Sequence, residues 1–284
     1  MTSLALGLVL AAAVCHALWN LLMKRAGDGV GGNLVFVWLF LLCSTTLWAP
    51  AAAIDTAIQR PHIGWAAVLF MAGSGLLHLG YFVLLQRGYR AGDLSVVYPL
   101  ARGTGPILAM IGAIVILGER PGPLAIVGGV AIALGIFGLG RGKPTPAAVA
   151  YAVATGGFIA VYTLWDKHGV DQLGVAPILY FWSGDLLRTL VLAAVCFPRR
   201  REAQAVFAAH RRAILGVAVL APLAYILVLF ALVFTPASYI APAREVSIAF
   251  ATALGVFLLG EGQARRRLVC ALVIVGGVVA LALG

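Results

Sequence analysis

Apolar residues dominate this chain in long runs that short polar stretches separate. A helix needs about 20 mostly apolar residues to cross the hydrocarbon core of a membrane, because each residue adds only about 1.5 Å along its axis. Ten runs meet this requirement, over residues 3–23, 33–54, 64–86, 93–117, 121–140, 145–165, 175–196, 212–234, 238–259 and 265–283. Residues 197–211 form the one long connection. The pattern predicts an all-α, polytopic membrane protein with ten transmembrane helices.

Composition supports this prediction. Hydrophobic residues make up 62% of the chain and charged residues 11%, whereas soluble domains average about a quarter charged. The formal charge of +10 lies mostly in short loops, without interleaved aromatic residues. We therefore expect a multi-pass protein of the inner (plasma) membrane. Its expected partners are the lipid bilayer and a small-molecule substrate, and not nucleic acid. The protein could be a monomer or a homodimer.

A long segment of the chain occurs twice. Residues 97–137 match residues 239–279 at a constant offset of 142, which aligns Arg102 with Arg244 and Gly118–Glu119 with Gly260–Glu261. The offset is half the chain length of 284 residues. It predicts two repeats of five helices, residues 1–142 and 143–284. Five is odd, so the second repeat is expected to enter the membrane inverted, as in many transporters.

Basic residues are unevenly shared between the two sets of loops. Most lie in the loops after the first, third, fifth, seventh and ninth runs, including Lys24, Arg25, Arg87, Arg90, Arg141, Lys143, Arg199–Arg201, Arg211, Arg212 and Arg265–Arg267. Cytoplasmic loops carry the excess of Lys and Arg. This distribution predicts cytoplasmic basic loops and both termini on the opposite side.

Ionisable residues within apolar runs are candidates for function, because they are costly in hydrocarbon. Arg102 and Arg244 stand at equivalent repeat positions, shortly after Pro99 and Pro242. Pseudo-symmetry would bring the arginines together near the membrane middle, where their planar forks can bind a carboxylate or phosphate. Alternatively, each arginine pairs with Glu245, helix carbonyls or a lipid headgroup. Glu245 is either a coupling proton carrier or a permanent counter-ion.

Aromatic and histidine side chains could line a cavity beside these arginines. The candidates for substrate binding, besides Arg102 and Arg244, are His16, Trp19, His78, Tyr81, Tyr98, Tyr162 and Trp165, and Tyr180, Trp182 and Tyr225 share this pattern. Aromatic residues near helix ends often form interfacial belts instead. Asp185 and Arg188 are three apart on one helix, which predicts an internal ion pair.

No pattern predicts an enzyme. We find no nucleophile motif, phosphate loop or metal-ligand spacing, and expect no catalytic residue, cofactor or metal site. Cys15, Cys43, Cys196 and Cys270 lie in apolar runs and suit helix packing. Asp93 and Glu119 are expected to cap the helices that follow them. Glycines of the fifth and tenth runs predict close contact between those helices.

Three motifs are distinctive: His16-Ala-Leu-Trp19-Asn20, the segment from Ser95 to Pro106, and the Gly118-Glu119 and Gly260-Glu261 turns. With these motifs the chain resembles the drug/metabolite transporter superfamily, and within it the EamA family with two EamA repeats. The resemblance implies alternating access, with helices 1, 3, 4, 6, 8 and 9 around a central cavity and helices 5 and 10 peripheral. It also implies cytoplasmic termini, opposite to the prediction from loop charge.

The superfamily that the chain resembles includes exporters of amino acids, exchangers of nucleotide sugars and triose phosphates, and small multidrug exporters. The first-helix glutamate of the multidrug exporters has no equivalent here, since this helix offers only His16. Two central arginines favour an anionic or zwitterionic substrate. The sequence therefore predicts a secondary transporter of small amphipathic metabolites, namely an exporter of the amino-acid type. The alternatives are an organic-anion, phosphonate or phosphate-ester carrier, or a multidrug exporter.

Overall fold

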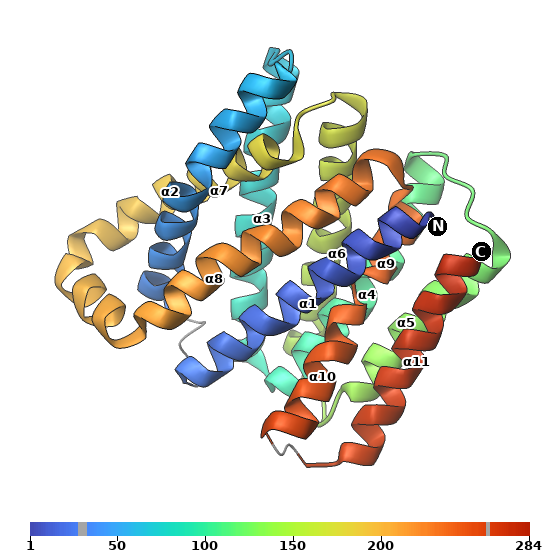
Figure 1. Ribbon diagram of the computed structural model, residues 1–284. Coiled ribbons are helices and arrows are strands. Elements are labelled where there is room, and N and C mark those ends of the chain that lie inside the picture. Colours follow the sequence, from blue (N-terminus) through green and yellow to red (C-terminus); the bar gives the residue numbers. More distant parts are fainter. Residues whose placement is uncertain (28–32, 260–261) are drawn as a thin grey trace.

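The computed structural model describes residues 1–27, 33–259 and 262–284, and this part of the chain contains helices but no strand (Figure 1). The helices are α1 (Ser3–Ala26), α2 (Leu34–Gln59), α3 (Trp65–Ala91), α4 (Leu94–Ile116), α5 (Pro123–Leu139), α6 (Pro146–Lys167), α7 (Pro177–Cys196), α8 (Arg200–Phe234), α9 (Ala237–Ala243), α10 (Val246–Leu259) and α11 (Ala264–Leu283). A π-helical turn, His168–Gln172, follows α6, and a 3₁₀ turn, Phe197–Arg199, precedes α8. The all-α prediction is confirmed.

Local signals explain where several helices begin. The Thr2, Asn33 and Thr145 side chains each accept a hydrogen bond from a backbone N–H in the first turn of α1, α2 and α6. Proline occupies the first turn of α5, α6 and α7, where its missing N–H costs nothing. These caps replace hydrogen bonds that water cannot supply near the membrane interior.

Most of the predicted membrane-spanning runs coincide with helices. Eight stretches in the described residues are long and apolar enough to cross a membrane, and α5 is a shorter apolar helix. One of the eight, Pro177–Phe234, is 58 residues long and contains both α7 and α8. The predicted run 238–259 is divided between α9 and α10. The chain is thus a multi-pass membrane protein.

The long connection predicted at 197–211 is instead mostly helical. Helix α8 starts at Arg200 and continues to Phe234, with non-helical backbone angles only at His210. Its first turns combine good helix formers with an ion pair, 2.7 Å between Arg199 Nη2 and Glu202 Oε2. Charge excluded this segment from the membrane-spanning prediction, but charge does not prevent a helix.

Helices α5 and α11 lie side by side at one edge of the molecule (Figure 1). Gly128 of α5 faces Gly277 of α11 so closely that a β-carbon on either would collide with the other's carbonyl oxygen. This confirms the predicted contact between the fifth and tenth runs. The two termini are also adjacent, since the Met1 amino group donates a hydrogen bond of 3.3 Å to the Ala282 carbonyl.

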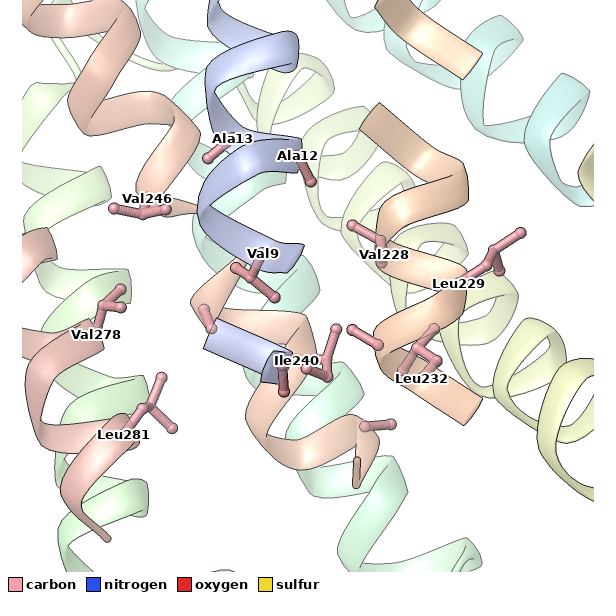
Figure 2. Close-up of a cluster of buried hydrophobic side chains, with 14 of the residues drawn as sticks. Val9, Ala12, Ala13, Val228, Leu229, Leu232, Ile240, Val246, Val278 and Leu281 are labelled. Carbon is pink, nitrogen blue, oxygen red and sulfur yellow. The ribbon is translucent and has the colours of Figure 1, made fainter. Parts of the chain in front are cut away.

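The remaining helices pack across the two halves of the sequence. Helix α1 packs against α8 and α10, while α6 packs against α3 and α4, and α2 packs against α7. A large apolar core lies where the halves meet. Figure 2 shows part of it, with Val9, Ala12 and Ala13 of α1 beside Val228, Leu229 and Leu232 of α8, and with Ile240, Val246, Val278 and Leu281 nearby.

Candidate functional site

A cavity of about 260 Å³ lies among the helices, slightly smaller than ligand pockets, which span roughly 300–1,000 Å³. Side chains of α1, α2, α3, α4, α6, α7, α8 and α10 line it, as does Arg244 between α9 and α10, but no residue of α5 or α11 does. Among the described residues, the peripheral position expected for the fifth and tenth runs is therefore observed. Helices α2 and α7 contribute as well, which the resemblance did not imply.

Most of the predicted substrate-binding residues meet at this cavity. Those that line it are His16, Trp19, His78, Tyr81, Arg102, Tyr162 and Arg244. Tyr98 and Trp165 are not among the lining residues. The Tyr98 ring lies 6.0 Å from the Arg102 guanidinium carbon, and Trp165 stacks on Phe70 and donates a hydrogen bond of 2.8 Å to its carbonyl. The Tyr98 ring therefore lies beside the site, whereas Trp165 packs against Phe70 outside the cavity lining.

The two arginines share one carboxylate. Glu245 Oε2 lies 2.7 Å from Arg102 Nη2, and Glu245 Oε1 lies 3.4 Å from Arg244 Nε. Glu245 is fully buried, and each arginine is 7% exposed. The predicted meeting of Arg102 and Arg244 is observed, and the alternative in which both pair with Glu245 holds at the same time. Two positive charges against one negative charge leave this group with a net positive charge.

The contacts between Glu245 and the two arginines bring opposite charges close together, but they leave several hydrogen-bonding groups without partners. Among the described residues, Arg102 Nε, Arg244 Nε and both Glu245 oxygens lack a partner with hydrogen-bond geometry, although the ion-pair distances are short. Buried donors without acceptors are costly, and a bound anion would relieve that cost. The arginines therefore retain capacity for a carboxylate or phosphate oxygen.

A local break in the helix explains how Glu245 reaches Arg102. Pro242 has no backbone N–H, and α9 ends at Ala243. The next backbone hydrogen bonds span three residues, from Glu245 N–H to Pro242 and from Ile248 N–H to Glu245. This turn carries Arg244 and Glu245 on a tightened backbone between α9 and α10.

An aromatic wall continues from Arg244. Its Nη2 donates a hydrogen bond of 3.1 Å to the Tyr162 hydroxyl, and the Tyr162 ring stacks on His78 at 4.2 Å between centroids. Tyr81 and Tyr225 meet Tyr162 edge-on. Rings of this kind offer an apolar surface beside charged groups. The site can hold an amphipathic molecule by its charged end and its apolar side.

Sequence reasoning missed Asp166. This fully buried carboxylate accepts hydrogen bonds from Tyr180 (3.0 Å) and Tyr225 (2.6 Å). Asp166 follows Trp165 and precedes Lys167, so it appeared to be part of a polar helix end. Its position late in an apolar run was the available signal.

The other polar residues have structural roles. Asp185 and Arg188 form the predicted pair, at 2.8 Å, and Ser44 donates a hydrogen bond to Asp185. Asp93 is at the start of α4 but its side chain makes no capping bond. The prediction that Glu119 caps the helix after it is wrong, because its carboxylate accepts from Ala237 and Ser238 N–H of α9, both at 2.8 Å. Gly260 and Glu261 lie outside the described residues.

In residues 1–27, 33–259 and 262–284, no three His, Cys, Asp or Glu side chains gather to hold a metal ion. The four cysteines are free thiols. The lining of the cavity offers charge, hydrogen bonding and apolar contact. Such a site can recognise a small molecule reversibly.

Comparisons with known proteins agree with this arrangement. One solved structure, described only as the crystal structure of a protein, has a TM-score of 0.76 to this chain at 16% identity, covering 100% of this chain and 98% of its own. It shows the same fold. A search of curated proteins finds no match. The model of the EamA-like transporter family matches twice, at residues 3–141 and 146–283. The chain is a membrane transporter of the drug/metabolite type, and it belongs to the EamA-like transporter family.

Proposed function

We propose that the protein is an alternating-access secondary transporter that exports small amphipathic metabolites of the amino-acid type. The observation that carries the proposal is the net positive Arg102–Glu245–Arg244 group in an aromatic cavity between the two halves. A bare cation would be repelled by this group. A carboxylate would be attracted, and the aromatic wall suits an apolar side chain.

In this proposal the substrate carboxylate binds between Arg102 and Arg244 and takes over part of their pairing with Glu245. Arginine can hold a carboxylate with two parallel hydrogen bonds, which fixes the orientation as well as the position. The substrate's side chain would then contact Trp19, Tyr81 or Tyr162. Rocking of the two halves around the bound molecule would exchange access between the two sides of the membrane.

The proposal includes the membrane topology. We propose ten spans in the inner membrane, with α9 and α10 forming one broken span, and two inverted repeats at 1–142 and 143–284. The double family match supports the repeats. The packing supports them too, because α1 contacts α8 while their repeat counterparts α6 and α3 contact each other. Helix breaks at membrane depth occur in transporters where they line a binding site.

The net positive charge also favours a second candidate. An organic-anion, phosphonate or phosphate-ester carrier would use the same two arginines, with no need to accommodate an ammonium group. The two candidates differ in the charge of the preferred solute. An amino acid is neutral overall, whereas a phosphate ester carries one or two negative charges at neutral pH.

A transport panel tests both candidates. Proteoliposomes would be supplied with labelled amino acids, organic anions, phosphonates, phosphate esters and quaternary cations. Saturable amino-acid flux that falls by more than about tenfold in Arg102→Ala and Arg244→Ala would support the proposal, since hydrogen bonds to charged groups contribute about 1.5–3 kcal/mol. Arg87→Ala, at an exposed position of α3, is the matched control.

Flux of anions alone would establish the second candidate. Cation flux that survives both arginine substitutions would contradict the role of the arginines and restore the multidrug alternative. Each variant's folding would be checked by its yield in the membrane fraction and its elution from a size-exclusion column.

A further inference from the structure

A second buried polar group lies next to the substrate cavity. It consists of His78 on α3 and Asp166 on α6, with Tyr180 and Tyr225 bound to the Asp166 carboxylate. We propose that His78 and Asp166 together bind the proton whose movement drives transport. This inference rests on the proposed transport function and identifies its coupling ion and the site that carries it.

The hydrogen bonds of His78 determine where a proton can be added. Its Nδ1 lies 2.9 Å from the Ser74 carbonyl oxygen, which can only accept, so Nδ1 carries a hydrogen. Its Nε2 is buried and has no hydrogen-bond partner among the described residues. Nε2 lies 4.0 Å from Asp166 Oδ2. A lone pair therefore faces a carboxylate, and a proton between them would join the two groups.

Among the described residues, Asp166 has no ion-pair partner other than His78. The neighbouring Lys167 is occupied elsewhere: its Nζ donates to the Leu232 and Thr235 carbonyls at 2.7 and 3.2 Å and pairs with Asp171 at 3.0 Å. Within the described residues, His78 is the one basic side chain within 4.0 Å of the Asp166 carboxylate. A buried carboxylate whose close partners are hydroxyl groups is poorly compensated when ionised.

The charges around the pair come from several helices. The positive charge of Arg188 on α7 acts electrostatically on both His78 and Asp166, but Arg188 forms an ion pair with Asp185 on the same helix. Arg244 acts on His78 from the α9–α10 turn. The other titratable groups that face the pair are Tyr162 on α6, Tyr180 on α7 and Tyr225 on α8. All three are neutral donors or ring partners at ordinary pH.

The cavity gives the proton a route to the pair. His78 and Tyr225 line the cavity, whereas Asp166 lies behind them with no exposed surface. A hydronium ion in the cavity can transfer its proton to His78 Nε2, which leaves water and converts neutral His78 to an imidazolium ion opposite Asp166. The return of that proton to water on the other side completes the cycle with charge and atoms balanced.

The same contacts connect the proton to the substrate. The His78 ring stacks on Tyr162, and the Tyr162 hydroxyl accepts a hydrogen bond from Arg244. Protonation would draw the imidazolium from 4.0 Å toward hydrogen-bond distance from Asp166, and this movement would shift the ring against which Tyr162 stacks. A proton on His78 and an anion at Arg244 thereby act on one continuous set of side chains.

Glu245, the coupling candidate from sequence, is differently placed. It is held between two arginines at 2.7 and 3.4 Å, which suits a permanent counter-ion. The His78–Asp166 pair instead has one unoccupied acceptor and room for one proton. The geometry therefore favours this pair over Glu245 as the coupling site.

The first experiment counts protons without any substrate. Purified protein in lipid nanodiscs is taken from pH 8 to pH 5, and proton uptake is measured for the wild type, His78→Gln, Asp166→Asn and the double variant. If one proton is shared, each single variant should take up about one proton fewer, and the double variant should lose no more, because coupled groups titrate as a unit. Asp171→Asn is the control for loss of a carboxylate.

Additive losses in the double variant, or no loss in His78→Gln, would overturn the shared site. The count is independent of the substrate, so it holds even if no solute in the transport panel is carried. It therefore separates failure of this inference from failure of the proposed function.

The second experiment tests coupling in proteoliposomes, with whichever panel solute the wild type carries. One proton per solute allows accumulation of about tenfold for each pH unit of gradient. Asp166→Asn and His78→Gln should both lose this accumulation. Asp166→Asn, whose side chain is outside the cavity lining, should keep solute exchange at equal pH within about twofold of wild type. Gradient-driven accumulation equal to wild type in both variants would refute the proposal.

Discussion

Helix α4 and the α9–α10 segment carry equivalent arginines on different backbones. Arg102 lies inside α4, which continues from Leu94 to Ile116. Arg244 follows the last residue of α9, and the chain turns through Glu245 before α10 begins at Val246. Duplication therefore accounts for the position of both charges but not for the local structure around them.

The difference lies in the residue after each arginine. Position 103 is glycine, and a β-carbon there would collide with the ring of Phe137 on α5. The corresponding Glu245 sits in the turn, where its carboxylate contacts both arginines. One repeat thus supplies the counter-ion for the whole site, while the other keeps close helix packing. Identical repeats could not produce this shared pairing.

The strongest test of the comparison removes the shared carboxylate. Glu245→Ala leaves two buried guanidinium groups without a counter-ion, and we expect a loss of about 3–5 kcal/mol in the free energy of unfolding. Denaturant unfolding in detergent would measure it. Glu202→Ala, which breaks an exposed pair with Arg199, should cost less than about 1 kcal/mol.

A second substitution sharpens the same result. Arg102→Met added to Glu245→Ala should recover part of the stability, because one buried charge fewer remains unpaired. A double variant less stable than Glu245→Ala alone would show that the arginines do not depend on this carboxylate.

The next largest effect concerns position 103. Gly103→Val should destabilise the protein by about 2 kcal/mol, because the added side chain must displace the Phe137 ring in a closely packed contact. Thermal unfolding monitored by circular dichroism would detect the change. Gly157→Val is a suitable comparison, since a β-carbon there meets nothing within 4 Å. Equal losses at both positions would rule out the contact as the cause.

A smaller loss of stability is expected from a substitution at the start of α9. Glu119→Ala removes the acceptor of two N–H groups at the start of this helix and should cost about 1 kcal/mol of unfolding free energy. Asp93→Ala is the control, because that side chain makes no capping bond in α4. A larger loss from the Asp93 substitution would contradict the assigned cap.

The smallest effect concerns the hydrogen bond that orients Arg244. Tyr162→Phe removes the hydroxyl that accepts this bond but keeps the stacked ring. We expect a loss of about 0.5–1 kcal/mol in the free energy of substrate binding, measured as a two- to fivefold rise in KM for transport. Tyr239→Phe, outside the cavity lining, should leave KM unchanged. An unchanged KM in Tyr162→Phe would separate this bond from substrate recognition.

Hydrophobic patterning predicts most of this fold because crossing a membrane requires a long apolar run, whatever the run contacts. The same reasoning found Arg102 and Arg244, since charges within such runs are conspicuous. It could not find the partner of Glu119, which lies 118 residues away at Ala237. It also missed Asp166, whose burial depends on Tyr180 and Tyr225 from other helices. Those contacts exist only after the helices pack.

The brevity of α9 has a mechanical consequence. Seven helical residues extend only about 10 Å, with Glu119 of the first half bound at one end and Arg244 at the other. A rigid helix of that length links the α4–α5 turn directly to Arg244. A tilt that displaces this turn must therefore move the guanidinium group of Arg244, or break the two hydrogen bonds between Glu119 and the start of α9.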